Sequence, residues 1–213
     1  MATSERLVLV GNGGHAKVVL GVARSLGIRL AGIIAAEPAE LGGLPHLGGD
    51  DAYPDLLADG AVVGFVFGIG SVSRATAERR ARIFDRLAAA GGQAPALVHP
   101  TANLAEDIRI GVGSVIGRAA VVAEGVTVGR NVILNTAAVV DHDCIVGDHA
   151  HLAPGVVASG GVRIGRGVLV GVGARLVQNI TIGDGAVVGA GAVVLADVPA
   201  GATVVGVPAR IVG

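Results

Sequence analysis

The chain has 213 residues, a formal net charge of −1 and 36 glycines, and 52% of its residues are hydrophobic although only 2% are aromatic. The lack of a basic excess argues against a nucleic-acid partner, and a single cysteine excludes an intrachain disulfide framework. Without a leader segment or an apolar run of about 18 residues, we expect a soluble, cytoplasmic protein. A core of Val, Ile, Leu and Ala without large rings is typical of a narrow, repeating interior.

Residues 1–97 alternate short apolar runs with helical segments. We expect three strands, at Arg6–Val10, Leu30–Ile34 and Ala61–Phe67. We expect helices at Lys17–Leu26, Asp51–Leu57 and Ala75–Ala90, the last with Ala81, Ile83, Phe84 and Leu87 inward, and a loop at Glu37–Asp50. Alternating strands and helices predict a parallel sheet, so this part should be a small, Rossmann-like α/β nucleotide-binding domain.

A glycine-rich turn, Gly11-Asn12-Gly13-Gly14-His15, follows the first predicted strand and leads into a helix. Such a turn presents free backbone N–H groups and a helix dipole to phosphate, and its spacing matches the G-x-G-x-x-A fingerprint. A dinucleotide fold needs a second mononucleotide half, for which the chain has no room before residue 98. A single nucleotide or nucleotide diphosphate is therefore favoured over NAD, and a tight turn without a ligand is the third alternative.

From Val98 to Val194 every sixth residue is aliphatic, which gives seventeen consecutive hexapeptides without an insertion. Four residues after each lies a second small apolar residue, and only Ser114 departs from this rule. Three short strands would form a triangular coil of 18 residues, and stacked coils would pair through parallel backbone hydrogen bonds. Residues 98–213 should therefore form a parallel β-helix domain with a short C-terminal extension.

The register separates inward from outward residues. His142 is outward and lies between Asp141 and Asp143, whereas Cys144 is inward. A carboxylate beside a histidine fixes its tautomer and raises its basicity, so His142 is a candidate general base. Cys144 should be a small core residue and not a nucleophile.

The 18-residue coil also predicts vertical neighbours. Gly160 should stack one coil above His142, with Glu124 one coil below. A glycine there leaves the wall bare, so that a thioester or pantetheine arm can approach the backbone. His151 is half a coil from His142 and projects from another side, so the two can share a site only across a subunit interface.

Five motifs carry a resemblance that spans the chain: the glycine-rich turn, Leu134-Asn135-Thr136, Asp141-His142-Asp143, Gly147-Asp148-His149-Ala150-His151 and Val205-Gly206-Val207-Pro208-Ala209-Arg210. Together they resemble the bacterial nucleotide-aminosugar N-acetyltransferases, which are hexapeptide-repeat enzymes related to sialic-acid O-acetyltransferases. The resemblance implies a left-handed β-helix and a homotrimer that binds acetyl-CoA between its subunits. It also implies an N-terminal domain that binds the nucleotide-sugar.

The resemblance carries roles over to individual residues. His142 would be the base, Asp143 its partner, and Asn135 would face the sugar. The nucleotide-sugar would contact Asn12, Gly13, Gly14 and His15. The acetyl-CoA site would include His151, near the acetyl carbonyl, and Gly160, Val172 and Ala190, and no metal is expected.

The expected reaction is N-acetylation of the 4-amino group of a GDP- or UDP-linked 4-amino-4,6-dideoxyhexose, by direct attack in a ternary complex. Where UDP-sugar enzymes of the family often carry an acidic pair, this chain has Ile34-Ala35-Ala36-Glu37, which makes guanine plausible. Three other functions remain open. They are O-acetylation of a sugar hydroxyl, a metal-dependent hydratase of the γ-carbonic-anhydrase kind that uses His142, His149 and His151, and a structural or nucleotide-sensing solenoid.

Overall fold

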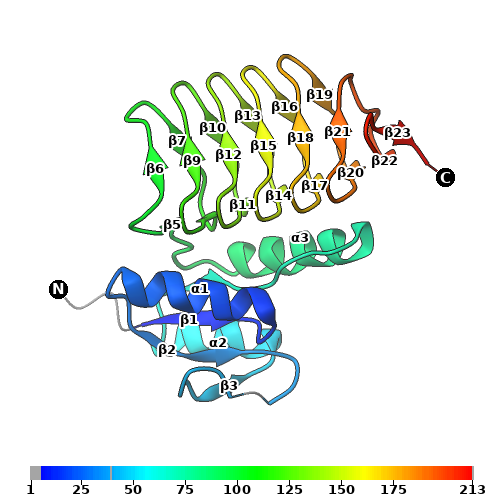
Figure 1. The fold of residues 1–213 in the computed structure, drawn as a ribbon. Helices are drawn as coiled ribbons and strands as arrows, with labels where there is room; N and C mark the ends of the chain where they lie inside the picture. The colour runs from blue at the N-terminus through cyan, green and yellow to red at the C-terminus, as the bar shows by residue number, and fades with distance from the viewer. Residues whose placement is uncertain (1–5, 39, 213) are drawn as a thin grey trace.

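Two parts are stacked in the computed structural model, which describes residues 6–38 and 40–212 (Figure 1). The first is a four-stranded parallel sheet of order β3-β2-β1-β4 with three α-helices and one 3-10 helix. Its strands are β1 (Leu7–Val10), β2 (Leu30–Ile34), β3 (His46–Gly48) and β4 (Gly64–Phe67). Its helices are α1 (Gly14–Ser25), η1 (Asp50–Ala52), α2 (Tyr53–Ala58) and α3 (Arg74–Ala89).

The expected strands and helices of this part are present, with shifted ends. Strand β2 has the predicted bounds, whereas α1 begins three residues earlier than predicted, directly after Gly13. Within the predicted loop at Glu37–Asp50 lies a strand that sequence reasoning missed, β3, whose His46 pairs with Ile33 at the sheet edge. It was missed because it has only three residues and follows Pro45.

Helix α3 lies between the sheet and the second part of the chain (Figure 1). It begins with a capping box in which Ser73 and Thr76 satisfy each other's backbone N–H groups. Its buried residues are Ala77, Arg80, Ile83, Phe84 and Leu87. Of the four residues predicted to face inward, Ala81 is only half-buried, and the buried arginine was not expected.

The second part is a triangular parallel β-helix whose seventeen short strands, β5 to β21, match the seventeen predicted hexapeptides. The face toward the α/β part consists of β5 (Leu97–Val98), β8 (Val115–Ile116), β11 (Ile133–Leu134), β14 (His151–Leu152), β17 (Leu169–Val170), β20 (Val187–Val188), β22 (Thr203–Val205) and β23 (Arg210–Ile211). The second face consists of β6 (Asn103–Leu104), β9 (Val121–Val122), β12 (Val139–Val140), β15 (Val157–Ala158), β18 (Arg175–Leu176) and β21 (Val193–Val194). The third consists of β7 (Arg109–Ile110), β10 (Thr127–Val128), β13 (Ile145–Val146), β16 (Arg163–Ile164) and β19 (Thr181–Ile182).

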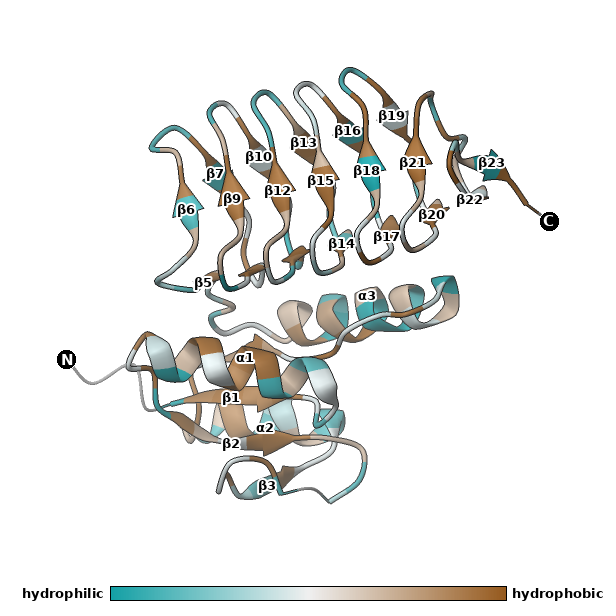
Figure 2. Cartoon of the chain, in the orientation of Figure 1, coloured by the Kyte–Doolittle hydropathy of each residue, from teal (hydrophilic) through white to brown (hydrophobic). Residues whose placement is uncertain are grey.

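The interior of the prism is aliphatic, as the hydropathy of its strands shows (Figure 2). Strand partners are 18 residues apart, as in Val140 with Ala158, because each coil contains three hexapeptides. The period shortens only at the C-terminal end, where Ile182 pairs with Val198. There the antiparallel strand β23 covers the last coil.

The corners of the coils stack into three edges, which we name by what lies beside them. The α3 edge contains residues 130–131, 148–149 and 166–167, and Arg80 and Asp85 of α3 contact it. The α1 edge contains residues 118–119, 136–137, 154–155, 172–173 and 190–191, and its first two corners share a cavity with α1. The outer edge contains residues 124–125, 142–143, 160–161 and 178–179 and lies away from the α/β part.

Candidate functional site

A cavity of about 710 Å³ lies between the α/β part and the α1 edge of the prism. The glycine-rich turn Gly11–His15 and the loop Gly68–Val72 line one side, and Asn135, Thr136 and His151 line the other. Gly13 caps α1 in an extended conformation, and no side chain accepts a hydrogen bond from the first turn. The N-terminal amides of α1 are therefore available to an anion.

His15 lines this cavity from the first turn of α1, and its Nε2 atom is shielded without a hydrogen-bond partner among the described residues. Burial, and then the charges of Arg80 and His151, lower the pKa of His15 to about 3. The ring is therefore neutral at pH 7, with one polar atom left for a ligand. Its centroid is 6.3 Å from that of His151.

His151, on β14, is held in one tautomer. Its Nδ1 atom lies 3.0 Å from the Ser71 carbonyl oxygen, which can only accept, so Nδ1 carries the proton. Its Nε2 atom then accepts from Asn135 Nδ2 at 3.3 Å. Burial and the charge of Arg80 lower the pKa of His151 to about 4. A neutral ring in this tautomer has no Nε2 proton to donate to an acetyl carbonyl, and its Nε2 lone pair accepts from Asn135.

His142 lies on the outer edge, where its side chain is 61% exposed. Its Nδ1 atom is 2.9 Å from Asp143 Oδ2, and its backbone N–H donates to Asp141 Oδ1 at 2.8 Å. The hydrogen bond with Asp143, and then the charge of Asp141, raise the pKa of His142. Nε2 is left free to accept a proton from a nucleophile.

Gly160 lies directly against the His142 ring, in the neighbouring coil. A Cβ on Gly160 would be 2.5 Å from His142 Nε2, and the Gly161 N–H donates to the His142 carbonyl oxygen at 2.8 Å. The predicted stacking is therefore present. Cys144, on the same coil, is buried; its Sγ donates to the Ser159 carbonyl oxygen at 3.2 Å, and burial raises the pKa of the thiol, so it is no nucleophile.

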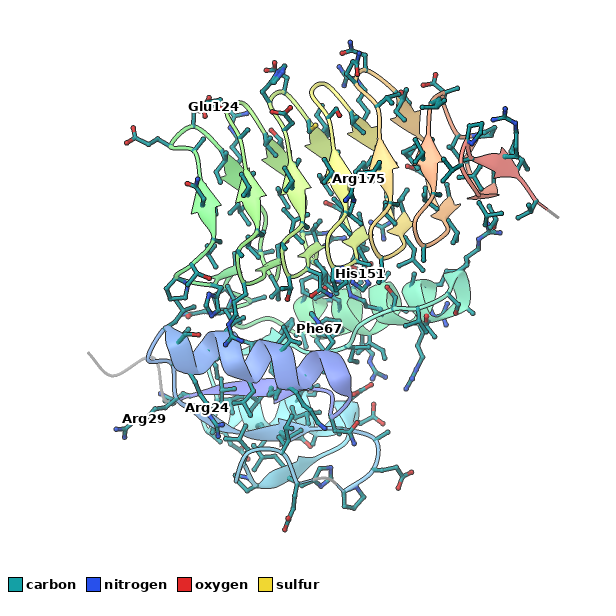
Figure 3. The ribbon with its side chains drawn as sticks, viewed as in Figure 1. Arg24, Arg29, Phe67, Glu124, His151 and Arg175 are labelled. Carbon is teal, nitrogen blue, oxygen red and sulfur yellow. The ribbon has the colours of Figure 1, made fainter. Side chains whose placement is uncertain are left out.

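These two groups of residues do not meet within one chain. His151 faces the α/β part, whereas Glu124, one coil below His142, lies on the far side of the prism (Figure 3). Val172 and Ala190 continue the α1 edge beyond Pro154, which lines the cavity, but Gly160 belongs to the outer edge. The predicted acetyl-CoA residues are thus divided between two edges.

Two family models match the chain, one in the α/β part and one in the prism. Residues 6–87 match the family described as the PglD N-terminal domain, and residues 161–196 match the bacterial transferase hexapeptide (six repeats). A solved structure of perosamine N-acetyltransferase (PerB) from Caulobacter crescentus, in complex with CoA and GDP-perosamine, is 36% identical. The match covers 98% of this chain and 97% of that one, with a TM-score of 0.92.

The chain belongs to the hexapeptide-repeat sugar N-acetyltransferases. Its prism is accordingly the left-handed parallel β-helix of this family. The acetyltransferase domain of PglB from Neisseria gonorrhoeae, in complex with acetyl coenzyme A, is 35% identical, with 98% and 99% of the two chains covered and a TM-score of 0.90. WeeI from Acinetobacter baumannii is 27% identical, with 97% and 99% covered and a TM-score of 0.80. No curated protein sequence matches the chain significantly.

This sugar N-acetyltransferase has three charged residues around the cavity: Glu37, Asp50 and Arg79. Asp50 already binds Arg86, 2.9 Å from its Oδ2 atom. Within residues 6–38 and 40–212, no three acidic, histidine or cysteine side chains are placed to hold a metal ion. In the same ranges, no helix is long and apolar enough to cross a membrane.

Sequence reasoning missed two residues that organise the cavity, Ser71 and Arg80. Ser71 gave no signal, because it contacts His151 through its backbone as well as its hydroxyl group. Arg80 did give one: it falls between Ala77 and Phe84 at helical spacing, where a core residue is expected. A charged residue at a core position is almost never buried without bound partners.

Proposed function

We propose that this protein transfers the acetyl group of acetyl-CoA to the 4-amino group of a nucleotide-linked 4-amino-4,6-dideoxyhexose. The observation that carries the proposal is the exposed His142–Asp143 pair, whose basic imidazole lies against Gly160 in the space that a side chain there would fill. The PerB structures, which hold CoA and GDP-perosamine, support the choice of substrates.

In the proposed reaction, the amine nitrogen attacks the thioester carbonyl carbon directly, without an acyl-enzyme. The new C–N bond forms while Nε2 of His142 takes a proton from the amine, and the C–S bond then breaks. The imidazolium returns that proton to the CoA thiolate. Asp143 keeps Nδ1–H oriented and stabilises the imidazolium, so that Nε2 carries the lone pair at the start of each turnover.

The complete site needs a second copy of the chain. In one chain, the cavity with His15, Asn135 and His151 is on the side of the α1 edge, and His142 is on the outer edge. We propose a homotrimer in which the outer edge of one subunit supplies His142 and Gly160 to the cavity of its neighbour. Acetyl-CoA would then lie between Gly160 of one subunit and the Val172–Ala190 edge of the other.

The charges of the cavity orient the nucleotide-sugar. The diphosphate would lie at Gly13 and Gly14, at the amino end of α1, and Arg79 would add a cation. Carboxylates repel phosphate, so Glu37 and Asp50 would be at the base. Guanine presents two neighbouring N–H donors to a carboxylate, which favours a GDP-sugar over a UDP-sugar at the Glu37 end.

The same proposal divides the chain into a nucleotide-sugar domain, residues 1–97, and an acetyltransferase domain, residues 98–213. The nucleotide-sugar domain would contribute Asn12, Gly13, Gly14 and His15 to the substrate, and the β-helix would contribute Asn135. A cytoplasmic location fits the single, buried cysteine, because thiols persist in a reducing compartment.

The test is release of CoA from acetyl-CoA with GDP-, UDP- and dTDP-linked 4-amino-4,6-dideoxyhexoses, each beside its 4-hydroxy counterpart. We expect turnover with an amino sugar, and with the GDP-linked one most efficiently. His142→Ala should lower kcat about 10²- to 10⁴-fold and leave nucleotide-sugar binding nearly unchanged. Turnover of the hydroxy sugars alone would replace the proposal with O-acetylation, and near-normal kcat in His142→Ala would remove the base from the mechanism.

A further inference from the structure

A buried arginine joins the two parts of the chain next to the cavity. Arg80 of α3 is 1% exposed, and its guanidinium donates to acceptors from three segments. Nε donates to the Ile69 carbonyl oxygen at 3.0 Å, and Nη1 to the His149 carbonyl oxygen at 2.9 Å. Nη2 donates to Asn131 Oδ1 at 2.8 Å and also contacts the Asn131 carbonyl oxygen.

Two of the acceptors of Arg80, the carbonyl groups of Ile69 and His149, belong to the segments on either side of the pocket histidine, His151. Ile69 belongs to the loop Gly68–Val72, whose Ser71 holds His151 Nδ1. His149 precedes His151 by two residues, and its backbone is left-handed, with φ +61°. The guanidinium therefore fixes both sides of the Ser71–His151 contact: the loop on one side and the corner of the prism on the other.

The charge of Arg80 is not neutralised by a neighbouring acid. No carboxylate lies within ion-pair distance of Arg80 in the described ranges, and the nearby Asp85 contacts Arg130, Arg166 and His149 instead. Only carbonyl oxygens accept from the guanidinium, so its net charge is kept. Such a cation in a low-dielectric region disfavours the protonation of neighbouring groups.

We propose that Arg80 is a positioning residue for the acetyl-transfer site: it locks the Gly68–Val72 loop onto the prism and favours neutral His15 and His151 rings, so that His151 Nε2 keeps accepting from Asn135 Nδ2 at the cavity wall. The groups that face these rings are Arg80 from α3, each ring toward the other, and the Ser71 carbonyl oxygen toward His151. All three nitrogen-bearing side chains are cationic if protonated, so the charge of Arg80 adds to the effect of burial in favouring neutral rings. Burial is the largest cause of the lowered pKa of both His15 and His151, and the charge of Arg80 is the second.

The chemistry of the substrate explains why this positioning by Arg80 would matter for the reaction, and this step rests on the proposed function. An amino sugar reacts as the free amine. A neutral His151 holds Asn135 through its Nε2 atom, whereas an imidazolium could not accept from Asn135 and would repel an ammonium group. By the same electrostatics, a fixed cation nearby favours the free amine over its protonated form.

Two substitutions separate the geometric from the electrostatic role. Arg80→Met removes both the charge and the donors, and Arg80→Lys keeps the charge but cannot bridge three segments. Arg82→Met is the matched control, because Arg82 is an exposed arginine on the same helix and makes no hydrogen bond to the described residues of the prism. Folding is checked first by circular dichroism and thermal melting.

The first readout is the NMR titration of the His15 and His151 ring protons, assigned by single histidine substitutions. It requires no substrate and so tests the inference even if the proposed reaction is wrong. In Arg80→Met the pKa of His151 should rise above about 4 but stay below 6.5, because burial still lowers it, and in Arg80→Lys and Arg82→Met it should stay near 4. The second readout is steady-state kinetics, in which Arg80→Lys should raise the nucleotide-sugar KM about tenfold and leave the acetyl-CoA KM unchanged.

An unchanged His151 pKa in folded Arg80→Met would overturn the electrostatic role, and an unchanged nucleotide-sugar KM in Arg80→Lys would overturn the positioning role. If Arg80→Met does not fold, Arg80→Lys decides alone: a raised nucleotide-sugar KM supports the inference, and equal losses for both substrates or none overturn it.

Discussion

His142 and Gly160 occupy neighbouring coils of the outer edge, and the imidazole fills the space in which a side chain at residue 160 would begin. A Cβ on Gly160 would lie 2.5 Å from His142 Nε2 and 2.6 Å from Cε1. The backbone of Gly160 is not in the left-handed region, so the local fold does not demand glycine there. The neighbouring histidine does, because its ring cannot keep this position beside a methyl group.

Gly160→Ala should therefore lower kcat about 10²-fold, since displacing a catalytic group by about 1 Å has effects of this size. Thermal stability should change little, because the His142 side chain is largely exposed and can swing outward. Gly21→Ala is the control: Gly21 lies in α1 with nothing within 4 Å of the added Cβ, so activity should persist and stability should rise by up to about 1 kcal/mol. Steady-state kinetics and melting curves measure both. Normal kcat in Gly160→Ala would contradict the placement of the base.

The pH dependence of turnover should follow the contact between His142 and Asp143. A base must be unprotonated to act, so kcat/KM should rise with pH through the His142 pKa, which the Asp143 hydrogen bond raises above its ordinary value. Asp143→Asn removes the charge and tolerates the left-handed backbone at this position, where φ is +58°. The acid limb of the profile should move to lower pH, while the maximal rate falls.

Glu124→Gln is the comparison for that profile. Glu124 lies on the same edge, but its charge makes the smallest contribution to the His142 pKa. The acid limb should therefore move less than in Asp143→Asn. The prediction is contradicted if the acid limb moves equally in both variants, or if it does not move in Asp143→Asn with the same substrate. Either result would show that the acid limb does not report the titration of the His142–Asp143 pair.

The prism could be predicted from the sequence because one residue type recurs there at a fixed spacing. An aliphatic residue every sixth position places Val140 inside and His142 outside, and three hexapeptides place Gly160 above His142 without further assumptions. The hand of the helix is not in that period and came from family resemblance. Strand β3 was not predicted because a strand of three residues directly after Pro45 is too short to show a hydrophobic pattern.

The candidate site could be predicted only in part, because half of it depends on how the two parts of the chain are packed. The glycine-rich turn indicated the anion-binding end of α1. Nothing in the local sequence of Ser71 or Arg80 says that one meets His151 and the other meets Asn131 and His149, 51 and more positions away. Such long-range polar contacts follow no periodicity in the sequence. Only the charged Arg80, at a core position of α3, indicated that one of them exists.

Acid should destabilise the fold through its buried histidines, and His149 offers the cleanest test. The His149 side chain is fully buried against Phe84, and burial lowers its pKa to about 4, with Asp85 opposing. The unfolded chain, with a pKa near 6.5, therefore binds more protons, so folding stability is lost as pH falls from about 6.5 to about 4, at most about 1.4 kcal/mol per pH unit for one such group. His149→Asn removes the titration and suits the left-handed corner, φ +61°. Urea unfolding at pH 7 and pH 4.5 should show a less stable variant at pH 7 but a smaller loss between the two pH values. The remaining loss belongs to His15 and His151, whose pKa values burial also lowers, and an identical loss in variant and parent would mean that His149 titrates normally in the fold.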